Sequence, residues 1–121
     1  MSIKQGQYQA TIIEQNIVEN KATLLLQIDP NIAYFDGHFD HYPVLPGVVQ
    51  IDWAIDYGNK LLACDGVFAG MEVIKFQQPI LPNMQLLLTL SWEKDKQKLY
   101  FSYTADENNY SSGRIKLEMA K

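Results

Sequence analysis

The feature that most constrains this chain is one long apolar segment at residues 47–63, directly after Pro46. Proline suits the first turn of a helix because its missing N–H has no partner there. The polar positions of the segment are Gln50, Asp52, Asp56, Asn59 and Lys60. A helix exposed along one side has a polar half. We therefore predict a central helix largely surrounded by protein, with part of that cover supplied by a second copy of so small a domain.

The remaining segments alternate β-branched or aromatic runs with polar or proline turns. We predict strands at residues 7–16, 21–28, 70–78, 84–93, 97–105 and 112–119. The predicted hairpin turns are Glu19-Asn20, residues 94–96 and residues 106–109. Two strands, one helix and four further strands are typical of the α+β class with an antiparallel sheet. The economical arrangement wraps that sheet around the helix.

Length and composition narrow the class further. A chain of 121 residues predicts one domain over residues 1–121. The net charge of −4 disfavours nucleic acid as a partner, because phosphate binding needs a basic surface. A single cysteine, Cys64, fits a reducing cytoplasm, although cysteine-poor periplasmic proteins share this pattern. No apolar run of ~18 residues is present, so we expect no membrane span.

The residues whose side chains are suited to catalysis lie in the segment 34–46 and in the predicted helix. Prolines and a glycine exclude a regular helix over 34–46, which holds both histidines of the chain, His38 and His41. Histidine is suited to proton transfer near neutral pH. In the helix, Asp52 and Asp56 are four residues apart and therefore share one face. These side chains are candidates for an acid–base site.

Two features of the helix support such a site. Asp52 has the apolar neighbours Val48, Val49 and Ile55, so we expect it to be desolvated, which would favour the protonated acid. The N–H of Gly47 is one of the donors that a helix start leaves without an intrahelical partner. A base, a neutral acid and such a donor are what α,β-elimination from a thioester requires. Composition and spacing alone do not select that reaction.

Residues 37–52 read GHFDHYPVLPGVVQID. This segment closely resembles the signature GHFPxxPVxPG, followed by an acidic residue, of the β-hydroxyacyl-acyl-carrier-protein dehydratases (the FabZ/FabA type). These enzymes have the hotdog fold. Residues 69–82, AGMEVIKFQQPILP, resemble a second segment of that family. Residues 43–54 most resemble the ApeI-like dehydratases of aryl polyene biosynthesis. The resemblance implies dehydration of 3-hydroxyacyl chains on acyl carrier protein, in fatty-acid-like or aryl polyene biosynthesis.

The resemblance also implies residue roles. His38 matches the catalytic histidine and Asp52 the catalytic carboxylate. Gly47 matches the residue whose N–H holds the thioester carbonyl, and Val44 the residue whose carbonyl orients the histidine ring. In the family, the histidine and the acid of one site come from different subunits, so the resemblance implies a homodimer or a hotdog heterodimer with shared sites.

We assign further residues to the substrate-binding site. The candidate substrate-binding residues are Phe39, Pro46, Val48, Trp53 and Asp56. Trp53 is assigned to a tunnel for a flat substrate or, equally, to the core.

The chain departs from the family pattern at three positions. Gly37 stands where the FabA branch has cysteine, which puts isomerase activity in doubt, and Asp40 stands where proline is usual. Asp56 stands in place of glutamine, and we hypothesise that its charge helps to keep Asp52 protonated.

Several alternatives stay open. Asp36, His38, Asp40 and His41 are conceivable metal ligands, but we predict no metal and no cofactor. Lys94, Lys96 and Lys98 form either a solvated hairpin or a basic patch for an acidic carrier protein. The competing functions are a hotdog thioesterase and a non-catalytic hotdog subunit that binds carrier protein.

Overall fold

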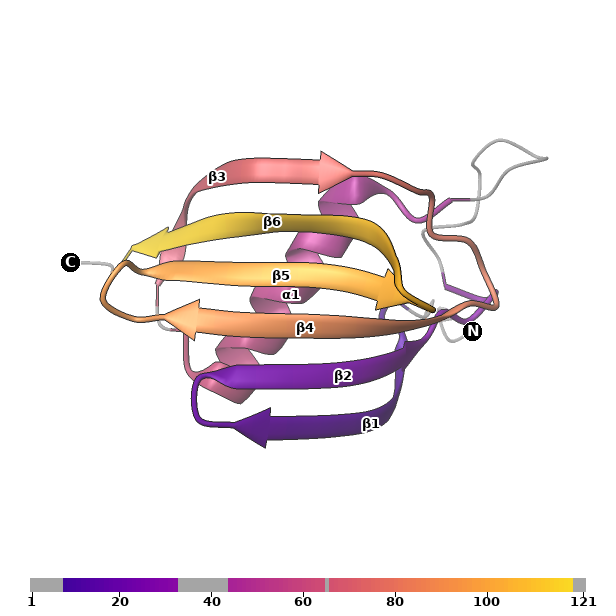
Figure 1. Ribbon diagram of the computed structural model, residues 1–121, viewed down its shortest axis with the longest axis horizontal. Coiled ribbons are helices and arrows are strands. Elements are labelled where there is room, and N and C mark those ends of the chain that lie inside the picture. Colours follow the sequence, from indigo (N-terminus) through magenta and orange to yellow (C-terminus); the bar gives the residue numbers. More distant parts are fainter. Residues whose placement is uncertain (1–7, 33–43, 65, 119–121) are drawn as a thin grey trace, which may run out of the picture.

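The computed structural model describes residues 8–32, 44–64 and 66–118. Within these ranges the elements are β1 (Thr11–Val18), β2 (Lys21–Gln27), α1 (Gly47–Leu62), β3 (Val67–Phe76), β4 (Gln85–Glu93), β5 (Lys98–Ala105) and β6 (Asn108–Glu118). The strands form one antiparallel sheet in the order β1-β2-β4-β5-β6-β3. Helix α1 crosses one face of this sheet (Figure 1). The predicted α+β class and the hotdog arrangement are confirmed.

Most element boundaries agree with the sequence prediction, and one of the two largest differences has a local cause. The strand predicted at 7–16 is observed as Thr11–Val18. The strand predicted at 112–119 begins four residues earlier, at Asn108. Asp106 and Glu107 have φ angles of 49° and 67°, which is the backbone of a two-residue hairpin turn. Because two residues complete the turn, the two asparagines that follow it belong to the strand.

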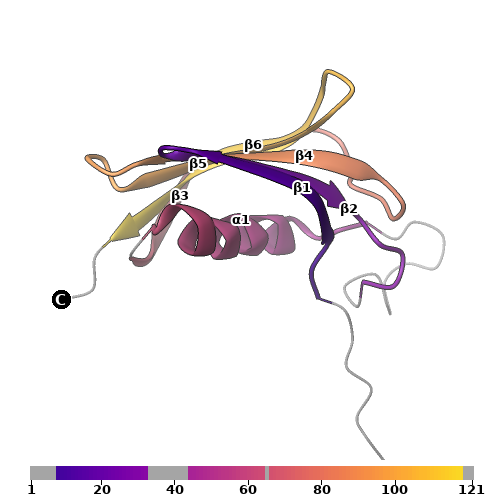
Figure 2. The same ribbon diagram turned by 90° about the horizontal axis from the view of Figure 1, so that it is seen from below.

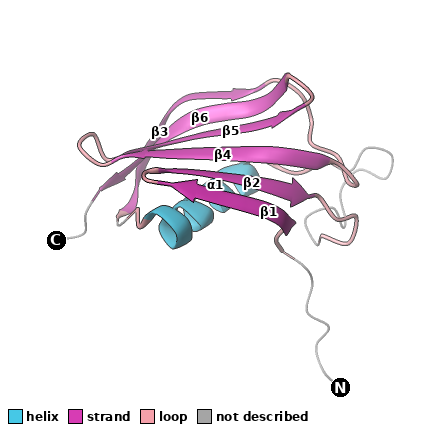
Figure 3. Ribbon diagram, turned by 60° about the horizontal axis from the view of Figure 1, so that its bottom comes forward, coloured by secondary structure: helices cyan, strands magenta, loops and turns pink. Residues whose placement is uncertain are grey.

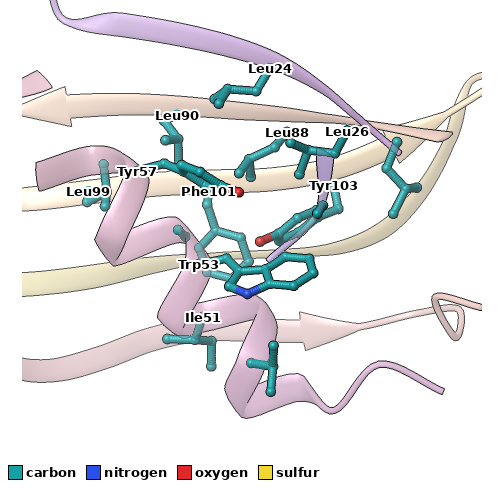
Figure 4. Close-up of a cluster of buried hydrophobic side chains, with 14 of the residues drawn as sticks. Leu24, Leu26, Ile51, Trp53, Tyr57, Leu88, Leu90, Leu99, Phe101 and Tyr103 are labelled. Atoms are coloured by element: carbon teal, nitrogen blue, oxygen red, sulfur yellow. The ribbon is translucent and has the colours of Figure 1, made fainter. Parts of the chain in front are cut away.

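The core lies between α1 and the inner face of the sheet (Figures 2 and 4). Alternate residues of the central strands point inward, as the period of two in a strand requires. The inward residues that are fully buried include Leu24, Leu26, Leu88, Leu90, Leu99 and Ile115. From the helix, Trp53 and Tyr57 pack against them. Cys64 is buried in this core.

Within one chain, the sheet covers only one side of α1. The side chains of Val49, Ile51, Trp53 and Tyr57 are buried against the strands. On the open side of the helix, 75% of the surface of Val48 is exposed. Figures 2 and 3 show that no other described helix or strand lies against this side, which Gln9 contacts through Asp56. The expected cover by a second copy stays a prediction. Among the described residues, no helix has the length and apolar character needed to cross a membrane.

Strand β3 contains a strained bulge. Its register with β6 shifts between Glu72 and Lys75, opposite Gly113. Within the bulge Val73 has φ 52°, a left-handed conformation that is unusual for a β-branched residue. A Cβ on Gly113 would lie 2.3 Å from the Cδ1 atom of Ile74, so the glycine makes room for the bulge. The bulge therefore combines a β-branched residue in strain with a glycine at which a larger residue would require Ile74 to shift.

We expect Val73→Asn to stabilise the protein by roughly 1 kcal/mol, because asparagine tolerates the left-handed backbone. Urea denaturation measures the change. Val67→Asn is the matched control, since Val67 lies in the same strand and is exposed to 56%, against 57% for Val73. That control should lose stability through its lower strand propensity. Equal losses in both variants would show that the bulge stores no strain at Val73.

Candidate functional site

The candidate site is built around the start of α1. Pro46 precedes the helix, and its carbonyl accepts hydrogen bonds from the N–H groups of Val49 at 3.1 Å and Gln50 at 3.2 Å. The earlier N–H groups of a helix have no intrahelical acceptor, and the helix dipole adds positive potential there. The N–H of Gly47, the first helical residue, therefore suits a developing negative charge.

Phe76 restricts what residue 47 can be. A Cβ added to Gly47 would lie 2.6 Å from the Cζ atom of the Phe76 ring. Only glycine fits beneath this ring without a displacement. Phe76 is the last residue of β3, and Figure 1 shows the end of this strand beside the start of α1. Sequence reasoning did not assign Phe76 to the site, although it belongs to the second family-like segment.

Asp52 lies on the open side of the helix, and its side chain is exposed. The expected desolvation of Asp52 is therefore wrong for a single chain. Its apolar neighbours do not enclose it: Val49 is buried against the sheet, Ile55 is half-buried, and Val48 points to solvent on the same side as Asp52. Residues at helical spacing lie close together on the helix surface. Whether that part of the surface is buried depends on where the sheet packs against the helix.

Asp56 is held by two partners. Its Oδ2 accepts hydrogen bonds from the Lys60 Nζ and the Gln9 Nε2, each at 2.9 Å. Partial burial would raise the pKa of the Asp56 carboxyl, but the bonds from Lys60 and Gln9 and the charge of Lys60 outweigh burial and lower it. Asp56 is therefore ionised and paired with a cation. The hypothesis that its charge keeps Asp52 protonated stays a prediction, and Lys60 counteracts that charge.

We expect the pairing of Asp56 to make a small contribution to stability that depends on pH. Because the pKa is lowered on folding, the contribution is present above the ordinary value of 3.8 and is lost as the pH falls through the folded value. Asp56→Asn should cost about 0.3–0.5 kcal/mol at pH 7 and less than that at pH 3. Urea denaturation at both pH values measures this. A cost that grows toward low pH would contradict it.

The other predicted residues fall into three groups. Val44 and Pro46 are half-buried at the helix start, close in sequence to Gly47. Trp53 is 1% exposed and its Nε1 donates to the Tyr8 carbonyl at 3.0 Å, so in this chain it belongs to the core. His38, Phe39, Asp40 and His41 lie outside the described residues. Over residues 8–32, 44–64 and 66–118, no group of three potential ligands is arranged to hold a metal.

The cavity on the outer face of the sheet is separate from this site. It has a volume of about 440 Å³ and is lined by residues such as Thr89, Ser102 and Arg114. These residues alternate along their strands with Leu88, Leu90 and Ile115, which pack toward α1. The sheet therefore stands between this cavity and the helix start.

The fold and the helix-start site place the chain among hotdog proteins related to dehydratases. A family model described as ApeI dehydratase (ApeI-like) matches residues 14–114, and the chain belongs to this family. A curated relative named 3-hydroxyacyl-(acyl-carrier-protein) dehydratase FabZ, from Polynucleobacter necessarius, is 32% identical over 85 residues, which are 64% of this chain and 57% of the relative. The chain spans less than two thirds of the length of the first curated relatives that it matches.

Two solved structures resemble the chain over nearly its whole length. One, the dehydratase heterocomplex ApeI:P from Xenorhabdus doucetiae, has 39% identity and a TM-score of 0.85, covering 90% of this chain and 97% of that one. The other, an uncharacterized protein from Erwinia carotovora, has 41% identity and a TM-score of 0.76, covering 93% and 95%. These comparisons agree with the resemblance found in the sequence.

Proposed function

We propose that this protein removes water from 3-hydroxyacyl thioesters carried on acyl carrier protein and forms trans-2-enoyl thioesters. The observation that carries the proposal is the matched span 14–114, which includes the signature from His38 to Asp52. The position of Gly47 at the first turn of α1 supports it, because that N–H suits an enolate oxygen. The single buried cysteine is consistent with a cytoplasmic enzyme.

The proposed chemistry uses the chain's own groups and no cofactor. His38 takes the proton from the carbon next to the thioester carbonyl, while the Val44 carbonyl orients its ring. The N–H of Gly47 stabilises the negative charge that develops on the carbonyl oxygen. Asp52 donates a proton to the hydroxyl on the next carbon, which leaves as water, and the double bond forms. Phe39, Pro46 and Val48 are the proposed surroundings of the acyl chain, whereas Trp53 packs in the core and Asp56 is paired with Lys60.

The decisive experiment is mass spectrometry of a 3-hydroxyacyl carrier protein incubated with the purified chain. Loss of one water supports the proposal. Release of the free acid would indicate a thioesterase, and an unchanged carrier would indicate a non-catalytic subunit. His38→Ala should abolish the loss of water, whereas His41→Ala, three residues along the same segment, should retain it.

The substrate is proposed more narrowly as a chain of aryl polyene biosynthesis. The support is the ApeI-like family of this chain. Comparing aryl-substituted unsaturated chains with saturated chains of equal length tests this preference. Docking of the carrier at Lys94, Lys96 and Lys98 also stays a prediction. Lys96 Nζ lies 3.5 Å from Glu93, and Lys98 Nζ lies 3.0 Å from Glu72, so two of these charges are paired within the chain.

We also propose that the chain pairs with a second hotdog chain, either another copy or a different protein. Within the described residues, β3 is an outer strand with a neighbour on one side only. Its exposed apolar side chains are Val67, Phe68, Met71, Val73 and Phe76. Long apolar edge strands are sites of pairing with another chain. The similar Xenorhabdus protein is itself part of a heterocomplex, which supports this proposal.

Met71→Lys should weaken this association by about tenfold or more, equivalent to about 1.4 kcal/mol, because a charge would enter the paired edge. Sedimentation velocity over a concentration series measures the change. Ile17→Lys is the matched control, since Ile17 is also exposed on an outer strand, β1, at the opposite edge. If the two variants weakened association equally, the β3 edge would not be the interface.

A further inference from the structure

A buried set of hydrogen bonds connects the helix start to the sheet, and we call it the Gln50 clamp. The Gln50 side chain is 4% exposed and uses both ends of its amide. Its Nε2 donates to the Leu45 carbonyl at 3.0 Å, and its Oε1 accepts from the Ser111 Oγ at 2.6 Å. The Gln50 main-chain carbonyl accepts from the Tyr103 hydroxyl at 2.7 Å. The clamp therefore consists of Gln50, Leu45, Ser111 and Tyr103.

The clamp determines where Leu45 lies. The N–H of Leu45 donates to the Ile80 carbonyl at 2.9 Å, while its own carbonyl is held by Gln50. Leu45 is thus fixed on one side to the segment between β3 and β4, and on the other to α1. Val44 precedes it, and Pro46 and Gly47 follow it. Any shift of the Leu45 carbonyl therefore moves the backbone groups on both sides of it.

We propose that Gln50 is a positioning residue, which holds the Val44 carbonyl and the Gly47 N–H in place through Leu45. This inference rests on the proposed dehydration, in which those two backbone groups orient the base and stabilise the enolate. Gln50 does not take part in proton transfer itself. A buried amide in the middle of an apolar helix face is costly unless both ends are bonded, and here both are.

The first test compares two leucine variants. Gln50→Leu removes both side-chain bonds and should lower kcat by about 10²-fold with little change in KM, because the reacting groups lose their alignment. Gln85→Leu is the matched control, since Gln85 is exposed on β4 and bonds only to Gln27 at 3.2 Å among the described residues. Thermal denaturation of each variant separates misalignment from unfolding.

The second test uses pH and does not depend on a loss of packing. In Gln50→Glu, a protonated carboxyl donates to the Leu45 carbonyl and accepts from Ser111, as the amide does. An ionised carboxylate has no proton to donate to Leu45. The activity of Gln50→Glu relative to wild type should therefore rise as the pH falls, whereas that of Gln50→Leu should not. Tyr103 is the titratable side chain bonded to residue 50, and burial raises its pKa well above its usual value, so it stays protonated throughout.

Hydrogen–deuterium exchange separates this inference from the proposed function. Gln50→Leu should speed exchange over residues 44–49 and leave β4 unchanged. If exchange rises but the wild type releases no water from the substrate, the clamp is correct and the dehydratase proposal is wrong. If exchange over residues 44–49 is unchanged, or if kcat of Gln50→Leu stays within about twofold of wild type, the inference is overturned.

Discussion

Asp52→Asn should reduce dehydration of a 3-hydroxyacyl carrier protein by about 10²–10⁴-fold, the range expected when a general acid is removed. Asparagine keeps the size of the side chain but has no acidic proton for the departing hydroxyl. Asp52 is exposed in the single chain, so the change should leave the free energy of unfolding within about 0.5 kcal/mol of wild type. Single-turnover kinetics under saturating substrate measure the chemical step.

Asp56→Asn supplies a matched control for this experiment. It makes the same chemical change one helical turn further along, at a carboxylate that is already paired with Lys60. Because Lys60 already counteracts the charge of Asp56, the rate of this variant should fall far less than that of Asp52→Asn. If Asp52→Asn retained most of the activity, or if Asp56→Asn lost as much, the acid would have been assigned to the wrong residue.

Trp53→Ala should lower the free energy of unfolding by about 3–5 kcal/mol, the usual cost of deleting a large buried aromatic side chain. Trp53 is 1% exposed and packs between α1 and the sheet (Figure 4). Its indole N–H also bonds to the Tyr8 carbonyl at 3.0 Å. Trp53→Phe keeps most of the buried surface and should cost much less, about 1 kcal/mol for the lost hydrogen bond with its partner near solvent.

This pair of variants also decides between the two assignments made for Trp53. A residue that lines an acyl tunnel can be shortened with little loss of stability and a change in chain-length preference. Shortening a core residue instead causes a large loss of stability and no change in chain-length preference. Urea denaturation combined with a chain-length series measures both. A stable Trp53→Ala variant that accepts longer chains would contradict the core assignment.

Much of the fold could be predicted because its signals are local. The helix starts at Gly47 as predicted, since proline and apolar spacing act within a few residues. Strand periodicity similarly identified the central strands β4 and β5 within one residue at each end. The start of β6 was missed because it depended on the turn backbone at Asp106 and Glu107, and neither residue type requires a left-handed conformation.

The candidate site was predicted only in part. His38, Asp52 and Gly47 are proposed for the site from their order along one continuous segment. Gln50 and Phe76 were missed, because their partners are remote in sequence: Ser111 is 61 positions from Gln50, and Phe76 contacts the start of α1 at Gly47 from strand β3. Within the motif, Gln50 looked like an ordinary polar helix residue.

The sequence by itself determined the element types, the fold class and the family-like signature, because each depends on residue spacing along the chain. The tertiary structure alone decided that Asp52 is exposed, that Gln50 is buried and that Val73 is strained. Periodicity defines the faces of a helix or strand. Which face becomes buried depends on the strands, distant in sequence, that pack against it. A local sequence pattern does not contain that information.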